Sequence, residues 1–253
     1  MSFYAIILAA GKGERMRGEA ASAEFPKVLR QLCGRPMIAY VIDAIRAAGV
    51  SDITIIVGFG ADHVRRTTGG RLRYILQKEQ LGSGHAVASG KGALGGRGGN
   101  ALIMCGDSPL FTAATISSLM EHHTETRTTI TLVSAVVDDP PGYGRVTRGP
   151  SGRITGIVEE KCATPEERAI REINGGAYAF DSKWLWANID RIEPGEGGEL
   201  YLTDLVRIAT SEGREVDAVP AAAEEVLGVN TPADLRRVED ILRRRAEGGA
   251  SKV

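Results

Sequence analysis

The stretch FYAIILAAGKGERM, residues 3–16, decides the fold class of this 253-residue chain. Residues 3–9 are continuously apolar and rich in β-formers, which is typical of a strand buried on both faces. Glycines at positions 11 and 13, together with the charged residues around them, then end the strand abruptly. Ligands of open parallel sheets bind outside the carboxyl ends of the strands. We therefore expect a site in the loop of residues 10–27.

Strand and helix patterns alternate through the first half of the chain. The periodicity predicts helices over 36–48, 62–67 and 85–94, and further strands over 52–59, 72–76 and 101–107. Thr112 is expected to cap the next helix, which carries Ile116 and Leu119 at helical spacing. This alternation favours an α/β fold, a mostly parallel sheet with helices on both faces.

The second half of the chain is richer in strands. Four strand-like segments without long helices between them lie at 130–137, 144–148, 153–160 and 173–180. Helices are predicted at 182–189, at 202–210 and from Thr231, with one more strand at 215–220. No clean linker divides the chain. We expect one domain over 1–245, whose second half forms a β-rich lobe, and a flexible tail over 246–253.

Composition excludes several classes of protein. The net charge of −1 gives no overall attraction to nucleic acid or to an anionic membrane, so neither is expected as a partner. No apolar run is long enough to span a bilayer. The three cysteines, at 33, 105 and 162, form no CxxC pair and no disulfide framework. These features indicate a soluble protein of the cytoplasm.

The glycine loop fits neither standard phosphate-binding motif. Met16 occupies the place of the third glycine in a dinucleotide fingerprint, and no Walker motif occurs. A bare GxG is more often a flexible turn, but Arg15 and Lys27 flank this one with two cations. Asp107 follows a buried strand at the same end of the sheet, where a carboxylate suits Mg²⁺. By itself, Asp107 is equally consistent with an ordinary Gly-Asp turn.

Nine motifs in order give the chain a family resemblance. They are LAAGKGERM, FPKVL, QKEQLGSGHAV, CGDSPL, GYGRV, GIVEEKCAT, EINGGAYAF, GELYLTD and GVNTPADL, and they cover residues 6–244. This series resembles the N-terminal pyrophosphorylase domain of bacterial N-acetylglucosamine-1-phosphate uridylyltransferases. The resemblance implies a Rossmann-like fold of the nucleotide-diphospho-sugar transferase type with a β-rich acceptor lobe. It also implies transfer of a uridylyl group from UTP to N-acetylglucosamine-1-phosphate, with release of pyrophosphate.

The same resemblance assigns roles to individual positions. It implies catalytic cations at Arg15 and Lys27, and Mg²⁺ as cofactor on Asp107 and Asn230. The nucleotide would be held by Ala9, Ala10, Gly11, Gln77, Gly82 and Ser83. The sugar phosphate would be held by Gly144, Glu159, Asn174 and Tyr201, with Thr203 nearby.

Some features depart from the family pattern and leave alternatives open. Glu14 and Gly175 stand where threonine is usual, and residues 17–25 lengthen the first loop. A related nucleotidyltransferase with another acceptor, such as glucose-1-phosphate, or another nucleotide is one alternative. A silent nucleotide-sugar-binding regulator is another. Bifunctional members of the family also carry a β-helix of hexapeptide repeats, which has acetyltransferase activity and drives trimerisation. This chain has no hexapeptide repeats, so we expect no acetyltransferase activity, and the oligomeric state stays open.

Overall fold

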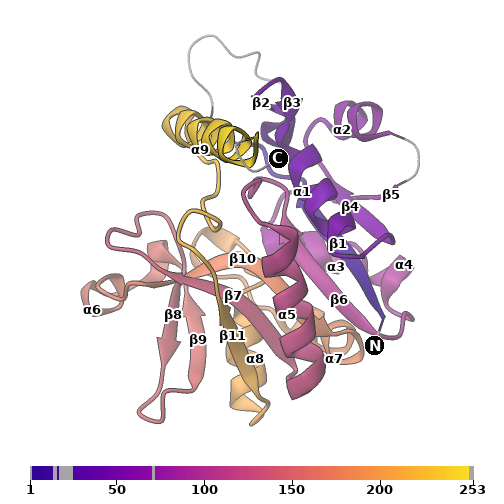
Figure 1. Ribbon diagram of the computed structural model, residues 1–253. Helices are drawn as coiled ribbons and strands as arrows, with labels where there is room; N and C mark the ends of the chain where they lie inside the picture. The colour runs from indigo at the N-terminus through magenta and orange to yellow at the C-terminus, as the bar shows by residue number, and fades with distance from the viewer. Residues whose placement is uncertain (1, 14–15, 17–24, 70–71, 251–253) are drawn as a thin grey trace.

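The computed structural model describes residues 2–13, 16, 25–69 and 72–250, and its centre is one twisted sheet (Figure 1). The strand order of its continuous path is β11-β7-β10-β6-β1-β4-β5. The seven strands are β1 (Phe3–Ala9), β4 (Ile53–Val57), β5 (Arg73–Leu76), β6 (Asn100–Cys105), β7 (Ile130–Val136), β10 (Glu172–Asp181) and β11 (Val216–Pro220).

Strand direction agrees with the predicted α/β class. β1 lies between two parallel neighbours, with Ala5 paired to Ile53 of β4 and to Leu102 of β6. β5 continues the parallel order beside β4, and β11 runs parallel to β7. β10 alone on this path runs antiparallel to its neighbours. The carboxyl ends of β1, β4, β5 and β6 therefore meet at one edge of the sheet, which we call the carboxyl edge.

The β-rich lobe is an extension of this sheet. β8 (Arg145–Arg148) pairs with β10 through Arg145 and Ile173, and β9 (Ile154–Val158) pairs with β8. The two strands project beyond the sheet next to α6 (Pro165–Arg168), as Figure 1 shows. The prediction of strand-rich additions in the second half is confirmed.

Helices cover both faces of the sheet. One face packs against α1 (Met37–Ala47), α2 (Ala61–Thr68) and α5 (Ala113–Thr126). The other packs against α3 (Ser83–Ala88), α4 (Lys91–Leu94), α7 (Ser182–Asn188) and α8 (Asp204–Ser211). Strand residues alternate between the two cores: Ile6 faces one and Ile7 the other, and both are fully buried. This two-sided burial explains why the strands read as continuous apolar runs.

The last helix closes a third, smaller core. Val238 and Ile241 of α9 (Pro232–Ala250) pack with Leu32, Met37 and the segment before the helix. Leu32 belongs to the small hairpin of β2 (Gln31–Leu32) and β3 (Arg35–Pro36), which lies beside α9 in Figure 1. The helix extends to residue 250, well into the segment predicted to be a flexible tail.

Two predicted elements differ in detail from the structure. Pro36 ends β3 and precedes α1, whereas we expected it in the first helical turn. The single helix predicted over 85–94 is two short helices, because Ser89 and Gly90 separate α3 from α4. Elsewhere Thr112 caps α5 as predicted, with its hydroxyl accepting from the Thr115 backbone N–H at 3.2 Å.

Candidate nucleotide and sugar-phosphate site

The turns that follow β1 and β6 lie side by side at the carboxyl edge. The Gly106 N–H donates to the carbonyl of Leu8 at 2.9 Å, and this bond carries the chain from β6 across to β1. A Cβ on Gly106 would lie 2.9 Å from the same carbonyl, so only glycine permits this approach. Asp107, the next residue, is thereby placed beside the end of β1.

Lys27, Asp107 and Asn230 meet at this edge, although 203 positions of sequence separate the first from the last. The Lys27 Nζ donates to Asp107 Oδ2 and, at 3.1 Å, to Asn230 Oδ1. The side chains of Lys27 and Asp107 are 13% and 23% exposed, which leaves the ion pair only partly screened by water. The structure thus brings together one predicted catalytic cation and both predicted metal ligands.

Backbone contacts fix each member of this cluster. Lys27 begins the short helix η2 (Lys27–Leu29) directly after Pro26, which restricts the chain there. The N–H of Val229 donates to the Asp107 carbonyl at 2.9 Å and so holds Asn230 next to Asp107. The carboxylate of Asp234 accepts from the N–H groups of Asn230 and Thr231 at 3.0 and 2.8 Å.

The donor set of this cluster fits Mg²⁺. Two oxygens, Asp107 Oδ2 and Asn230 Oδ1, both face the point where the Lys27 ammonium now lies. Mg²⁺ takes few protein ligands and completes its shell with water and substrate phosphate oxygens, so one carboxylate and one amide carbonyl suffice. The described part of the chain contains no group of three or more His, Cys, Asp or Glu arranged for a metal.

The predicted nucleotide loop is only partly described. Ala9 and Ala10 are buried at the end of β1, and Gly11 is exposed, with no atom of the described residues within 4 Å of where its Cβ would lie. Gly13, at φ +61°, packs against the side chain of Lys27. Glu14, Arg15 and most of the lengthened loop lie outside the described residues, so the role of Arg15 stays a prediction.

Gln77, Gly82 and Ser83 lie together after β5, and their role in holding the nucleotide stays a prediction. Gln77 is 3% exposed, and its Nε2 lies 3.1 Å from the Gly82 carbonyl oxygen and 3.0 Å from His85 Nδ1. The Ser83 hydroxyl accepts from the Leu202 N–H at 2.9 Å, which ties this segment to residues 199–203. Sequence analysis missed His85; its signal was the position three residues after Gly82 in the same motif.

The other three predicted sugar-phosphate residues lie near the carboxylate of Glu159. A Cβ on Gly144 would lie 3.5 Å from both Glu159 carboxylate oxygens, and the Asn174 N–H donates to the Gly144 carbonyl at 2.9 Å. Glu159 also influences the titration of Tyr201, whose pKa is raised chiefly by burial and next by its 2.8 Å hydrogen bond to Glu199.

Glu159 itself is a partly buried carboxylate with one hydroxyl donor. Burial raises the pKa of Glu159, and the Thr203 hydroxyl, which donates to Oε1 at 2.8 Å, opposes this shift. A carboxylate held this way accepts hydrogen bonds strongly, since little water competes for it. Thr203, noted in the sequence only as a neighbour, is therefore the partner of Glu159.

The Cys105 thiol is within electrostatic range of residues from both groups. Burial raises the pKa of Cys105 to about 12, and the charges of Asp107, Lys27 and Glu159 all act on it. The thiol stays protonated at neutral pH, so it is a poor nucleophile.

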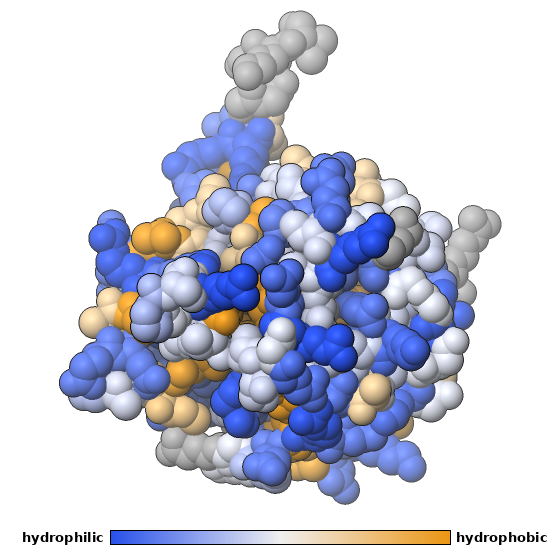
Figure 2. Space-filling model, turned by 90° about the horizontal axis from the view of Figure 1, so that it is seen from below, coloured by the Kyte–Doolittle hydropathy of each residue, from blue (hydrophilic) through white to orange (hydrophobic). Residues whose placement is uncertain are grey.

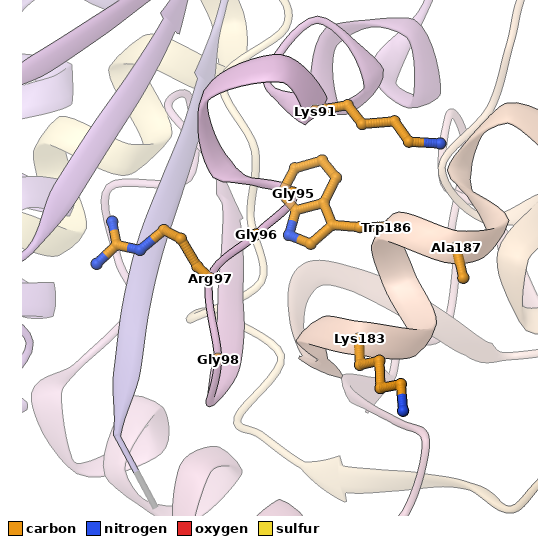
Figure 3. A pocket seen from close by; sticks show the side chains of 8 residues that line it. All are labelled: Lys91, Gly95, Gly96, Arg97, Gly98, Lys183, Trp186 and Ala187. Atoms are coloured by element: carbon orange, nitrogen blue, oxygen red, sulfur yellow. The ribbon is translucent and has the colours of Figure 1, made fainter.

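A hollow of about 660 Å³ lies away from this site. Figure 3 shows its lining, where the Trp186 indole lies between the loop of residues 95–98 and α7. Lys91 pairs with Asp190 and Arg97 with Asp52, and the Arg97 side chain points away from the indole. These cations therefore have partners of their own, and the hollow gathers no catalytic group among the residues that line it.

The outer surface shows no broad apolar area in the direction of Figure 2. Hydrophilic residues dominate that face, and hydrophobic residues appear on it in small separate groups. Among the described residues, no helix is both long and apolar enough to cross a membrane.

Comparisons with known proteins agree with this geometry. Residues 4–239 match the model of the family described as nucleotidyl transferase. The chain is 43% identical over 244 residues to the bifunctional protein GlmU of Halalkalibacterium halodurans, covering 96% of the chain and 52% of that protein. It is 41% identical to the protein of the same name from Exiguobacterium sibiricum, covering 97% of the chain and 54% of that protein. The chain thus spans about half the length of the curated relatives that it matches.

Solved structures agree on the fold. A UDP-glucose pyrophosphorylase complexed with UDP-glucose superposes with a TM-score of 0.80 at 15% identity. The match covers 97% of this chain and 100% of that one, and the apo form of that enzyme gives the same values. At this identity the likeness concerns the fold alone.

Proposed function

The chain belongs to the nucleotidyl transferase family, and from that premise we propose that it transfers a uridylyl group from UTP to N-acetylglucosamine-1-phosphate. The products are UDP-N-acetylglucosamine and pyrophosphate. The single observation that carries the proposal is the meeting of Lys27, Asp107 and Asn230 at the carboxyl edge. The bifunctional relatives support the choice of reaction, since this chain aligns with about half of each one.

The reaction is a substitution at the α-phosphorus of UTP. An oxygen of the sugar phosphate forms a bond to that phosphorus, and the bond from it to the bridging oxygen of the β-phosphate breaks. The electron pair leaves with pyrophosphate. A phosphate monoester has a second pKa of about 6, so the attacking group is already mostly dianionic at pH 7 and needs no general base.

The chain's main task is to hold two polyanions in line and to stabilise the charge that develops between them. Lys27 is the described cation placed for this task, and Arg15 is assigned a similar part by the family resemblance. We propose that Asp107 and Asn230 hold Mg²⁺, which when bound neutralises phosphate charge. Lys27, now paired with both of these residues, then moves its ammonium from their oxygens to the triphosphate.

The space that the described residues leave beside Gly11 supports a position for the nucleotide over the end of β1. Gln77 and the backbone of Gly82 and Ser83 then face the base. In the group of residues predicted to hold the sugar phosphate, Glu159 accepts a hydrogen bond from a hydroxyl of the amino sugar. Its raised pKa does not prevent this role, because a carboxylic acid and a carboxylate both offer acceptor oxygens.

A substrate panel tests the proposal. The protein, Mg²⁺, one nucleoside triphosphate and one sugar-1-phosphate are combined, and pyrophosphate release is followed. UTP with N-acetylglucosamine-1-phosphate is expected to give the highest kcat/KM. A higher value with glucose-1-phosphate or with another nucleotide would change the substrate assignment. No release with any pair, although the nucleotides bind, would leave a silent nucleotide-sugar-binding protein.

A further inference from the structure

Gln77 is a nearly fully buried residue whose side-chain nitrogen and oxygen differ in their hydrogen bonding. Its Nε2 lies 3.1 Å from the carbonyl oxygen of Gly82 and 3.0 Å from His85 Nδ1. Its carbonyl oxygen receives no hydrogen bond from any residue in the described ranges, although the side chain is only 3% exposed. The oxygen is therefore the part of this amide that is left to accept a hydrogen bond from a ligand.

Chemistry fixes which way this amide is turned. A backbone carbonyl only accepts hydrogen bonds, so the Gln77 atom that faces the Gly82 carbonyl must be the nitrogen. An amide NH₂ only donates, and so His85 Nδ1 must be the acceptor of its second N–H. The imidazole is then neutral, with its proton on Nε2. Turning the amide over would set its oxygen against the Gly82 carbonyl oxygen, which can only accept, and would lose that hydrogen bond.

We propose that His85 is a positioning residue that, with the Gly82 carbonyl, locks the Gln77 amide so that it offers a nucleobase only an acceptor. This inference rests on the proposed function, because it takes a pyrimidine nucleoside triphosphate as the ligand. Uracil presents a donor, its N3–H, in the middle of its pairing edge. Cytosine presents an acceptor, its unprotonated N3, at the same place, and would need the amide nitrogen that the lock has already used.

The backbone next to His85 is held by the segment that continues to Tyr201. The Gly84 N–H donates to the Leu200 carbonyl at 2.8 Å, and the Leu200 N–H donates to the Leu81 carbonyl at 2.7 Å. A Cβ on Gly82, whose φ is +108°, would lie 2.4 Å from the Leu200 carbonyl oxygen. The backbone on both sides of α3 is thus tightly placed, and His85 has little freedom to follow a turned amide.

Three variants of His85 test the lock. His85→Phe keeps a ring but removes the acceptor, His85→Ala removes both, and His85→Asn places a side-chain carbonyl near the position of Nδ1. We expect His85→Phe and His85→Ala to lower the ratio of kcat/KM for UTP over CTP about tenfold, the value of one hydrogen bond. The change is expected mainly in KM for UTP, with kcat and the KM for the sugar phosphate nearly constant. His85→Asn is expected to restore most of the ratio.

A double-mutant cycle separates positioning from direct contact with the base. In the Gln77→Ala background, His85→Phe should no longer change the UTP/CTP ratio, since the amide that it positions is absent. An equal effect in both backgrounds would overturn the proposal. The proposal also fails if Phe leaves the ratio unchanged, or if Asn behaves like Phe. Melting temperatures identify a variant that fails to fold, and His85→Ala then replaces His85→Phe.

Equilibrium binding keeps this test apart from the proposed function. Titration calorimetry with UTP and with CTP, in the absence of sugar phosphate, measures the same ratio without turnover. If the wild-type protein shows no turnover on the substrate panel but prefers UTP, and His85→Phe removes that preference, the proposed function fails and the lock stands. If turnover is as proposed but the binding ratio ignores His85, the lock fails alone.

Discussion

The site has a nucleotide side, with Lys27, Gln77, Asp107 and Asn230, and an acceptor side, with Glu159 and Thr203. The two sides are built in different ways. On the nucleotide side, Lys27 bridges two oxygen ligands, and the Gln77 amide nitrogen is bonded to Gly82 and His85 while no described residue donates to its oxygen. On the acceptor side, polar side chains already satisfy one another, as Glu159 does with Thr203.

This difference concerns what a ligand must change on arrival. The nucleotide has to displace a lysine from an ion pair, but it meets an amide already turned for it. The sugar phosphate meets the Glu159 carboxylate, which already accepts a hydrogen bond from Thr203 and would have to accept a second one from the sugar. We therefore expect substitutions on the nucleotide side to affect turnover most, and substitutions on the acceptor side to affect mainly the KM of the sugar phosphate.

The largest effect is expected for Asp107→Ala. This variant loses a proposed metal ligand, and kcat should fall by about three orders of magnitude, comparable to the loss of one strong electrostatic contact in a reaction centre. The fold should persist, because the bond from Val229 uses the backbone carbonyl of residue 107. Pyrophosphate release and circular dichroism measure the two properties. Asp62→Ala, whose parent side chain is 77% exposed, is the control. Full activity, or an unfolded variant, would contradict the placement of Asp107.

A smaller and more selective effect is expected for Glu159→Gln. The KM for N-acetylglucosamine-1-phosphate should rise at least about tenfold, as one strong acceptor is weakened, while the KM for UTP stays unchanged. Steady-state kinetics with each substrate varied in turn measures both values. Glu166→Gln, at an exposed position of α6, is the matched control. Equal changes in both KM values would remove the distinction between the two sides.

The same variant has a predicted dependence of stability on pH. Burial raises the pKa of Glu159 above its unfolded value, so stability from this group is present at low pH and is lost as the pH rises through the folded pKa. Glu159→Gln should therefore unfold at a higher urea concentration than the wild type at pH 8. The difference should disappear below the pKa of an unfolded glutamate, about 4.3. A variant less stable than the wild type at pH 8 would contradict this cause.

Thr203→Val is expected to have a still smaller effect. It removes the hydroxyl that donates to Glu159, and the KM for the sugar phosphate should rise about threefold to fivefold, within the range of one ordinary hydrogen bond. The free energy of unfolding should fall by about 1 kcal/mol, because a buried carboxylate loses its donor. Thr203→Ser keeps the donor and should restore both values. If Ser and Val behave alike, the hydroxyl has no role in holding Glu159.

The smallest effect is expected at the hollow of Figure 3. Lys183→Ala removes a cation that is exposed on α7, and both kcat and the two KM values should stay within about twofold of the wild type. The assay is the same substrate-varied kinetics. A large change in any of the three constants would mean that the hollow takes part in the reaction. The hollow would then have to be counted as a third part of the site.

Sequence patterns predicted the elements well where local physics sets them. The apolar run at residues 3–9 is β1 with the same bounds. A strand that is buried on both faces must be apolar along its whole length, so its composition alone marks it. Thr112 was recognisable as a cap from its own side chain and the helix that follows. The departure at Gly175 has a packing reason that no local pattern carries: a Cβ there would lie 2.9 Å from the Val133 carbonyl oxygen.

What the sequence by itself determined is the class of fold, the loop after β1 and, through the ordered motifs, the family. What only the tertiary structure decided is which side chains touch: Lys27 with Asp107 and Asn230, Thr203 with Glu159, and His85 with Gln77. The physical reason is range. Periodicity and capping act over a few residues. A contact between residues 203 positions apart depends instead on how the whole sheet is arranged in space. The nearest pair shows the same limit, since eight residues separate Gln77 from His85 and only the turn at Gly82 brings them together.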